Sequence, residues 1–190
     1  MKENAFYKYF SSFEGLQSQL WVEVIEDTLD SLEKDSAYAA FSTREKWLAF
    51  LFSFFEMLKS ERSLYIKIWP QRRSFFPEIS SDKMKKRFLE QAEKWLDEGR
   101  DEGVIKEDWI PEVLKNETAW WHFFFLMEFW KKDDSVDFER TDIAIEKSVH
   151  LLFDAYGNDV GERIVDFAKF LAPDKANPLD IFNQMVSSLR

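Results

Sequence analysis

Hydrophobic residues recur along most of this chain at the three- and four-residue spacing that is typical of α-helices. From Ser12 to about Lys34 they form two adjoining stripes, which predicts a long helix with a wide buried face. Ser42 and Glu45 stand at the spacing of a capping box and open a second helix, in which residues 47–58 are apolar on nearly every side. We expect this second helix to lie at the centre of the fold, because it has no face suited to water.

The same periodicity predicts six further helices. The first of them is short and stops before Pro70, and Gly99 and Gly103 end the next, which Ser81 can cap. The predicted ranges are 61–69, 81–98, 108–132, 137–156, 162–171 and 177–189. No internal repeat or low-complexity linker separates them. We therefore predict a single all-α domain of eight or nine helices.

The composition supports an all-α fold and narrows the class of protein. With only 5 Gly and 5 Pro among 190 residues, the chain has too few turn residues for a sandwich or barrel of many short strands. Its formal net charge of −10 repels phosphate backbones, so charge does not favour nucleic acid binding. The chain has no Cys, no signal-peptide pattern, and no apolar run near the roughly 20 residues that span a bilayer. We therefore expect a cytoplasmic protein.

Sequence patterns for catalysis or metal binding are missing. The chain has no Cys nucleophile, no Gly-rich phosphate loop, no His-Glu-x-x-His and no Gly-x-Ser-x-Gly sequence. Its 2 histidines, His122 and His150, stand on different predicted helices. Glu146 precedes His150 by four residues, whereas a carboxylate-bridged di-metal bundle uses a spacing of three. We interpret both histidines as hydrogen-bonded or solvent-facing, and we predict no catalytic residue, no metal site and no cofactor.

Aromatic residues are unusually abundant, since 20 Phe, 8 Trp and 5 Tyr make up 17% of the chain. The densest run, residues 120–130, leaves its helix with almost no polar side. Two compatible interpretations stay open: the rings form a core and subunit interface, or they line an apolar ligand pocket. The predicted pocket residues are Trp47, Phe50, Phe54, Phe88, Trp95, Trp120, His122 and Phe124, with His122 as the polar group that orients the ligand. For a two-fold homodimer through the helices at 119–131 and 138–156, we predict Phe129 and Phe153 as interface residues.

One stretch departs from the acidic charge of the whole. Residues 67–87 hold seven basic and two acidic side chains, which gives a local balance of +5 (7 − 2). The segment is either a solvated helix face or a basic surface that meets an anionic ligand or a membrane.

Residues 4–16 read Asn-Ala-Phe-Tyr-Lys-Tyr-Phe-Ser-Ser-Phe-Glu-Gly-Leu. They resemble the end of the TetR-family DNA-binding domain, where a Tyr and a Phe close the recognition helix and a Ser-x-x-x-Leu segment opens the long connecting helix. The resemblance continues as architecture, with a central apolar helix that begins Arg44-Glu45-Lys46 and two late helices that form the dimer in this family.

This resemblance implies that the chain consists of two parts. Residues 1–11 would be a remnant of a helix-turn-helix, and residues 12–190 a ligand-binding and dimerisation domain. Tyr7, Lys8 and Tyr9 match the phosphate-contacting end of the family's recognition helix. The family carries its first two helices and most of the third before this point, so we expect no specific DNA binding from this chain.

A second stretch, residues 133–141, is similar to part of the lipid-binding accessory proteins of coenzyme Q biosynthesis, which are also of TetR-like fold. Both resemblances imply an all-helical domain that binds an apolar small molecule. We therefore expect a binding protein and not an enzyme. The leading hypothesis is a TetR-like transcriptional regulator, whose hydrophobic effector binds among the central helices and alters the relative arrangement of the two subunits. The alternative is a lipid or quinone-type binding protein without a role on DNA.

Overall fold

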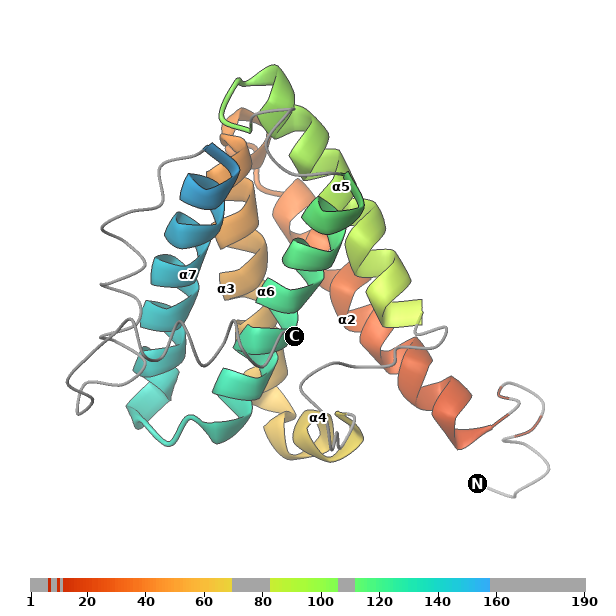
Figure 1. Ribbon diagram of the computed structural model, residues 1–190. Coiled ribbons are helices and arrows are strands. Elements are labelled where there is room, and N and C mark those ends of the chain that lie inside the picture. Colours follow the sequence, from red (N-terminus) through yellow and green to blue (C-terminus); the bar gives the residue numbers. More distant parts are fainter. Residues whose placement is uncertain (1–6, 8–9, 11, 70–82, 106–111, 158–190) are drawn as a thin grey trace.

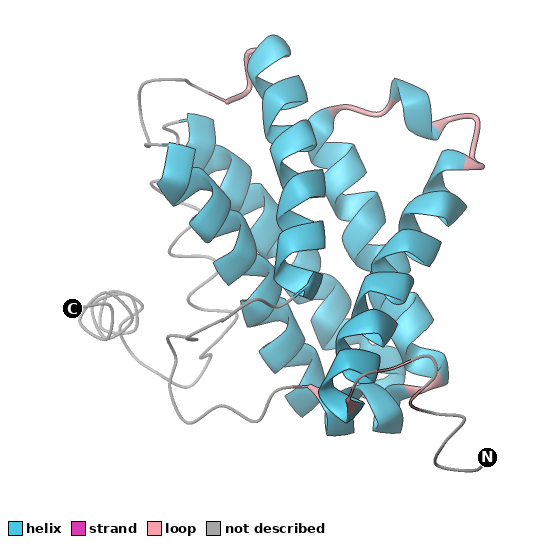
Figure 2. Ribbon diagram, turned by 90° about the vertical axis from the view of Figure 1, so that its right-hand side faces the viewer, coloured by secondary structure: helices cyan, strands magenta, loops and turns pink. Residues whose placement is uncertain are grey.

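The computed structural model describes residues 7, 10, 12–69, 83–105 and 112–157, and every regular element among them is helical (Figure 2). In chain order the elements are α2 (Phe13–Glu33), the 3-10 helix η1 (Tyr38–Ala40), α3 (Thr43–Ser60), α4 (Arg62–Ile68), α5 (Lys83–Asp101), α6 (Glu112–Lys132), the 3-10 helix η2 (Val136–Phe138) and α7 (Glu139–Gly157). The predicted all-α class is therefore confirmed for the described part of the chain.

The predicted count of eight or nine helices is not matched. The described residues form six α-helices and two single-turn 3-10 helices, and each α-helix corresponds to one predicted range. The predicted helices at 162–171 and 177–189, and the predicted cap at Ser81, lie outside the described residues. Neither 3-10 helix was predicted, because a single turn is too short to produce a hydrophobic period.

The central position of α3 is confirmed. It packs against α2 and α5 on one side and against α7 on the other, while α6 packs against α5 and α7. Figure 1 shows α7 on the left, α3 and α6 in the middle, and α5 and α2 on the right. Because α3 is enclosed from several directions, its apolar residues are buried almost all round the helix, although Phe52 stays 38% exposed.

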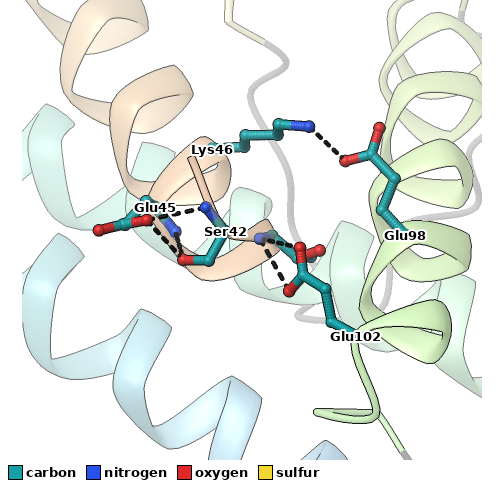
Figure 3. Close-up of polar contacts among 6 residues, drawn as sticks. Ser42, Glu45, Lys46, Glu98 and Glu102 are labelled. Carbon is teal, nitrogen blue, oxygen red and sulfur yellow. Dashed lines mark hydrogen bonds and ion pairs between the residues drawn. The ribbon is translucent and has the colours of Figure 1, made fainter. Parts of the chain in front are cut away.

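Polar contacts attach the start of α3 to the end of α5 (Figure 3). The predicted capping box is present: Ser42 N donates to Glu45 Oε2 over 2.8 Å, and the Ser42 side chain accepts from Glu45 N. Thr43 N donates to the Glu102 carboxylate over 3.0 and 3.1 Å, and Lys46 Nζ lies 2.7 Å from Glu98 Oε2. A backbone donor at the start of α3 is thus satisfied by a side chain from the turn that follows α5, 59 residues away in the sequence.

Gly99 has a different role from the predicted helix stop. α5 continues through it to Asp101, and Gly103, with φ of +73°, forms the left-handed turn that follows. A Cβ at Gly99 would lie 2.6 Å from Ile105 Cδ1 and 3.2 Å from Thr43 Cγ2. Residue 99 is therefore glycine because another side chain occupies the space of a Cβ.

The corner between α6 and α7 is built around one buried carboxylate. Asp133 accepts four hydrogen bonds, from the backbone N and Oγ of Ser135 at 2.9 and 2.7 Å and from the backbone N and Oγ1 of Thr141 at 2.8 and 2.6 Å. Burial by itself raises the pKa of Asp133, but the bonds from Thr141 and Ser135 outweigh burial and hold that pKa below its usual value. Residues 133–141, singled out in the sequence, therefore form a helix-capping turn.

Arg62 of α4 forms hydrogen bonds with the same corner. One of its guanidinium nitrogens donates to the carbonyl oxygens of Trp130, Lys131 and Asp133, each at 3.2 Å. These carbonyls lie at the end of α6, where helix oxygens lack a partner within the helix. The guanidinium also lies over the ring of Phe138, 4.9 Å from its centroid.

None of the helices in the described ranges is long and apolar enough to cross a membrane.

Candidate functional site

Rings from four helices form one connected group, which we call the aromatic cluster. α3 supplies three of them at spacings of three and four residues, so all three lie on the same side of that helix. Every member is buried. The members are Trp47, Phe50 and Phe54 of α3, Phe88 and Trp95 of α5, Trp120, His122 and Phe123 of α6, and Phe153 of α7.

Trp47 connects all four helices. Its ring centroid lies 5.4 Å from that of Trp95, 5.9 Å from Phe153 and 6.4 Å from His122. Phe88 and Phe123 join α5 to α6 with centroids 4.5 Å apart. Such separations are within the range at which aromatic rings attract each other, so the rings hold α3, α5 and α6 together across the middle of the domain.

The structure brings seven of the eight predicted pocket residues into this cluster. The eighth, Phe124, lies on a neighbouring face of α6, where its ring centroid is 5.6 Å from Trp69 and 6.2 Å from Trp121. Trp69 in turn contacts Trp21 of α2, with centroids 5.4 Å apart. Phe124 therefore belongs to a second group of rings, because one residue along a helix turns the side chain by about 100°.

His122 connects the cluster to α7. Its Nε2 lies 2.8 Å from Ser148 Oγ, and the Ser148 hydroxyl donates to the Ile145 carbonyl oxygen over 3.2 Å. Burial lowers the pKa of His122 to about 3, so the imidazole is neutral at physiological pH. The imidazole is hydrogen-bonded, as the sequence predicted for the histidines.

Three nitrogen atoms of the cluster have no hydrogen-bond partner within the described part of the chain. They are Trp47 Nε1, Trp120 Nε1 and His122 Nδ1. More than nine in ten buried polar groups in proteins are paired, and leaving one unpaired costs about 1–3 kcal/mol. These three nitrogen atoms are therefore the polar positions of the cluster at which a water molecule or a ligand would gain a hydrogen bond.

The His122–Ser148 pair is buried, and Ser148 Oγ is shared between His122 Nε2 at 2.8 Å and the Ile145 carbonyl oxygen at 3.2 Å. No group of three or more His, Asp or Glu side chains in the described ranges is placed to hold a metal ion.

Comparison with protein families matches residues 46–171 of the 190 to the family described as Tetracyclin repressor-like, C-terminal domain. The chain belongs to this family. The match starts in the first turn of α3 and includes every later described helix, so the aromatic cluster lies entirely within the TetR-like domain. Membership confirms the resemblance to the TetR family for its C-terminal domain and favours a regulator over an enzyme. No curated protein and no solved structure matches the chain.

The two predicted interface residues occupy different environments in the TetR-like domain. Phe129 is partly exposed on α6, with the Arg140 guanidinium 5.9 Å from its ring centroid and the Phe125 ring 6.0 Å away. Phe153 is buried within the subunit, where its ring packs on Trp47. Phe129 is therefore at the surface of α6, and Phe153 is a member of the aromatic cluster.

The basic segment of residues 67–87 lies mostly outside the described residues. At its described end, Arg87 Nη2 donates to Glu26 Oε2 of α2 over 3.0 Å, and the hydrogen bond to Glu26 raises the pKa of Arg87. Lys85 Nζ lies 5.9 Å from the centroid of the Trp120 ring. Arg87 thus contacts α2, and Lys85 contacts α6.

Sequence reasoning missed two residues of the site. Phe123 follows Trp120 by three residues, a spacing that places both rings on one side of α6 and could have indicated its role. Ser148 lies on the buried face of α7 beside Ile145 and Val149. A small polar residue within an apolar stripe indicates a buried hydrogen bond, but the stripe alone does not identify His122 as the partner.

Proposed function

We propose that this chain is the regulatory domain of a TetR-like transcriptional regulator and binds an apolar small molecule within the aromatic cluster. The ligand-binding and dimerising part spans residues 12–190. The observation that carries the proposal is the cluster itself: a buried set of rings at the meeting point of α3, α5 and α6, with polar atoms that have no partner among the described residues. Apolar walls with a few polar groups are typical of small-molecule sites.

Ligand binding would reach the dimer through α6. The same helix carries Trp120 and His122 into the cluster and Phe129 on its partly exposed side. His122 also binds Ser148 of α7, so a ligand that moves this imidazole moves α6 and α7 together. Differential affinity of the ligand for two arrangements of these helices is the coupling that regulation requires.

The proposed homodimer uses α6 and α7. Trp121, Phe125 and Phe129 recur every four residues on α6, and all three are only partly buried. Ile143 of α7 is 40% exposed. Two-fold interfaces are commonly built from an apolar stripe along one side of a helix, and each subunit contributes the same surface to the contact.

Native mass spectrometry of the protein purified from cells tests the ligand. We expect a retained apolar molecule, released on unfolding, and a Phe50→Ala variant that retains less of it. Phe52→Ala is the matched control, because Phe52 lies on the same helix but is 38% exposed. A retained lipid or quinone would favour the binding-protein alternative. A protein that retains nothing, and whose melting temperature no apolar compound raises, would contradict ligand binding.

Sedimentation tests the dimer. We expect a dimer at tens of micromolar and a monomer for Phe129→Arg, because a buried unpaired charge is costly at an interface. Phe52→Arg should remain a dimer. A wild-type monomer at that concentration would refute the proposed interface.

A further inference from the structure

Two consecutive residues in the corner between α6 and α7 have a left-handed backbone although neither is glycine. Asp137 has φ of 52° and Phe138 has φ of 62°. This conformation is unfavourable for residues with a side chain, and more so for a bulky one such as Phe138 than for an aspartate. The same turn leaves Val136 83% exposed. The corner is therefore costly in backbone strain and in exposed apolar surface, so other contacts must hold it.

Arg62 of α4 contacts both sides of this corner. On the side of α6, its Nη2 donates to the carbonyl oxygens of Trp130, Lys131 and Asp133, each at 3.2 Å. On the side of α7, its guanidinium lies 4.9 Å from the centroid of the Phe138 ring. One side chain thus connects the end of α6 to the strained residue that precedes α7.

The hold of Arg62 on the corner can be released without unfolding the core. α4 has seven residues and none of them is buried, whereas α3, α5 and α7 each bury at least six. Segments that bury few residues open at a lower free energy than the helices of the core. Arg62 Nε is also buried and has no hydrogen-bond partner among the described residues, so the closed arrangement leaves this donor unsatisfied.

We propose that the corner between α6 and α7 is a strained latch, held closed by Arg62, that opens separately from the rest of the domain. In the closed latch, the contacts of Arg62 offset the cost of the left-handed backbone at Asp137 and Phe138. When Arg62 leaves, both residues can adopt an ordinary backbone conformation. Because the corner joins α6 to α7, its opening lets these two helices change their relative arrangement. This device goes beyond the proposed function and requires neither a ligand nor a dimer.

Hydrogen exchange, followed by NMR on the full chain, measures the opening of the latch. The reporter is the amide of Thr141, which donates to Asp133 Oδ2 over 2.8 Å within the corner. The reference is the amide of Phe54 in the middle of α3. We expect Thr141 to be at least about tenfold less protected than Phe54, because the corner opens while the core stays folded. Equal protection of both amides would mean that the corner opens only on global unfolding, and would overturn the latch.

A glycine at position 137 tests the strain. Asp137→Gly removes the unfavourable backbone at one residue, so the closed latch is favoured and exchange at Thr141 should slow about three- to fivefold. Asp137→Asn is the matched control, because it removes the same charge but keeps a side chain. It should leave the exchange of Thr141 within about twofold of the wild type. Exchange that is unchanged or faster in Asp137→Gly would contradict the strain.

A second pair of variants tests the role of Arg62. Arg62→Gln should speed exchange at Thr141 by at least about tenfold, and by a much larger factor than at Phe54. Lys59→Gln is the matched control, because Lys59 Nζ also lies 3.3 Å from Asp137 Oδ1 and 5.9 Å from the Phe138 ring, but donates to no α6 carbonyl oxygen in the described ranges. It should have little effect.

The outcomes for these variants decide whether Arg62 holds the latch. Equal acceleration at Thr141 and Phe54 in Arg62→Gln would show that Arg62 stabilises the whole domain, and would overturn the proposal. The same acceleration at Thr141 in Lys59→Gln would also overturn it, because Arg62 would then have no special role. If Arg62→Gln does not fold, the comparison of Thr141 with Phe54 in the wild-type protein still decides whether the corner opens by itself.

Discussion

Burial of His122 predicts that the domain loses stability as the solution becomes mildly acidic. In the unfolded chain this imidazole has its ordinary pKa of about 6.5, whereas burial lowers the pKa to about 3 in the folded domain. Below pH 6.5 the unfolded state therefore takes up a proton that the folded state does not. The folded state becomes less stable as pH falls from about 6.5 toward 3, by about 1.4 kcal/mol for each pH unit.

The loss of folding stability at pH 5 does not depend on the detailed value of the pKa of His122 in the folded domain. At that pH the folded imidazole is neutral for any pKa well below 5, and the unfolded one is almost fully protonated. The loss between about pH 7.5 and pH 5 is then 1.5 pH units at about 1.4 kcal/mol each, or roughly 2 kcal/mol. This is a sizeable part of the 5–15 kcal/mol that is typical of a folded domain.

Urea denaturation followed by tryptophan fluorescence measures this effect at the two pH values. The informative quantity is the difference in unfolding free energy between wild type and His122→Gln, since other titrating groups cancel in it. We expect that difference to change by roughly 2 kcal/mol between pH 7.5 and pH 5, with the wild type losing more stability. Ser148→Ala should keep the wild-type pH dependence, because burial rather than the hydrogen bond lowers the pKa of His122. A difference that is the same at both pH values would refute the argument.

Three further predictions concern stability and can be checked by the same denaturation experiment. Asp133→Asn should destabilise the domain by about 2–3 kcal/mol, because an amide N–H₂ replaces an oxygen that accepts from Thr141; the deficit should shrink as pH falls below about 4, because Asp133 is then protonated in the unfolded wild-type chain while its lowered pKa keeps it ionised in the folded domain. Gly99→Ala should cost about 1–3 kcal/mol, because the added Cβ would lie 2.6 Å from Ile105 Cδ1, and Ile105→Ala should recover part of that loss in the double variant. Phe123→Ala should cost about 3–5 kcal/mol if the ring is tightly packed, and a cost under 1 kcal/mol would contradict its central place in the cluster.

The helices of this domain were predictable because their signals are local. The capping box at Ser42 and the stripe along residues 84–96 each lie within one element, and α3 and α5 begin and end near the expected residues. The role of Gly99 was not predictable, because it depends on Ile105 and Thr43, which fill the space where its side chain would lie. The sequence alone does not distinguish a glycine that ends a helix from a glycine that leaves space for a side chain of another segment.

The site was predictable to the extent that it depends on helix faces. Trp47, Phe50 and Phe54 could be assigned to one side of α3, because residues three and four apart share a face. Whether Phe123 or Phe124 points into the cluster depends on the rotation of α6, which a helix apolar on all sides does not reveal. The partner of His122 is 26 residues away on α7, and no sequence period connects them.

The central place of α3 has a consequence for how the protein is made. Synthesis of α3 is complete at Ser60, but its partner α7 ends at Gly157, so roughly 100 residues follow before the enclosure is finished. At translation rates of about 5–20 residues per second, this interval is roughly 5–20 s. During that time Trp47 has α2 beside its helix but lacks Phe88, His122 and Phe153. A helix that is apolar on nearly every side therefore remains incompletely covered during this interval, and we expect folding in the cell to depend on chaperones that bind exposed aromatic segments.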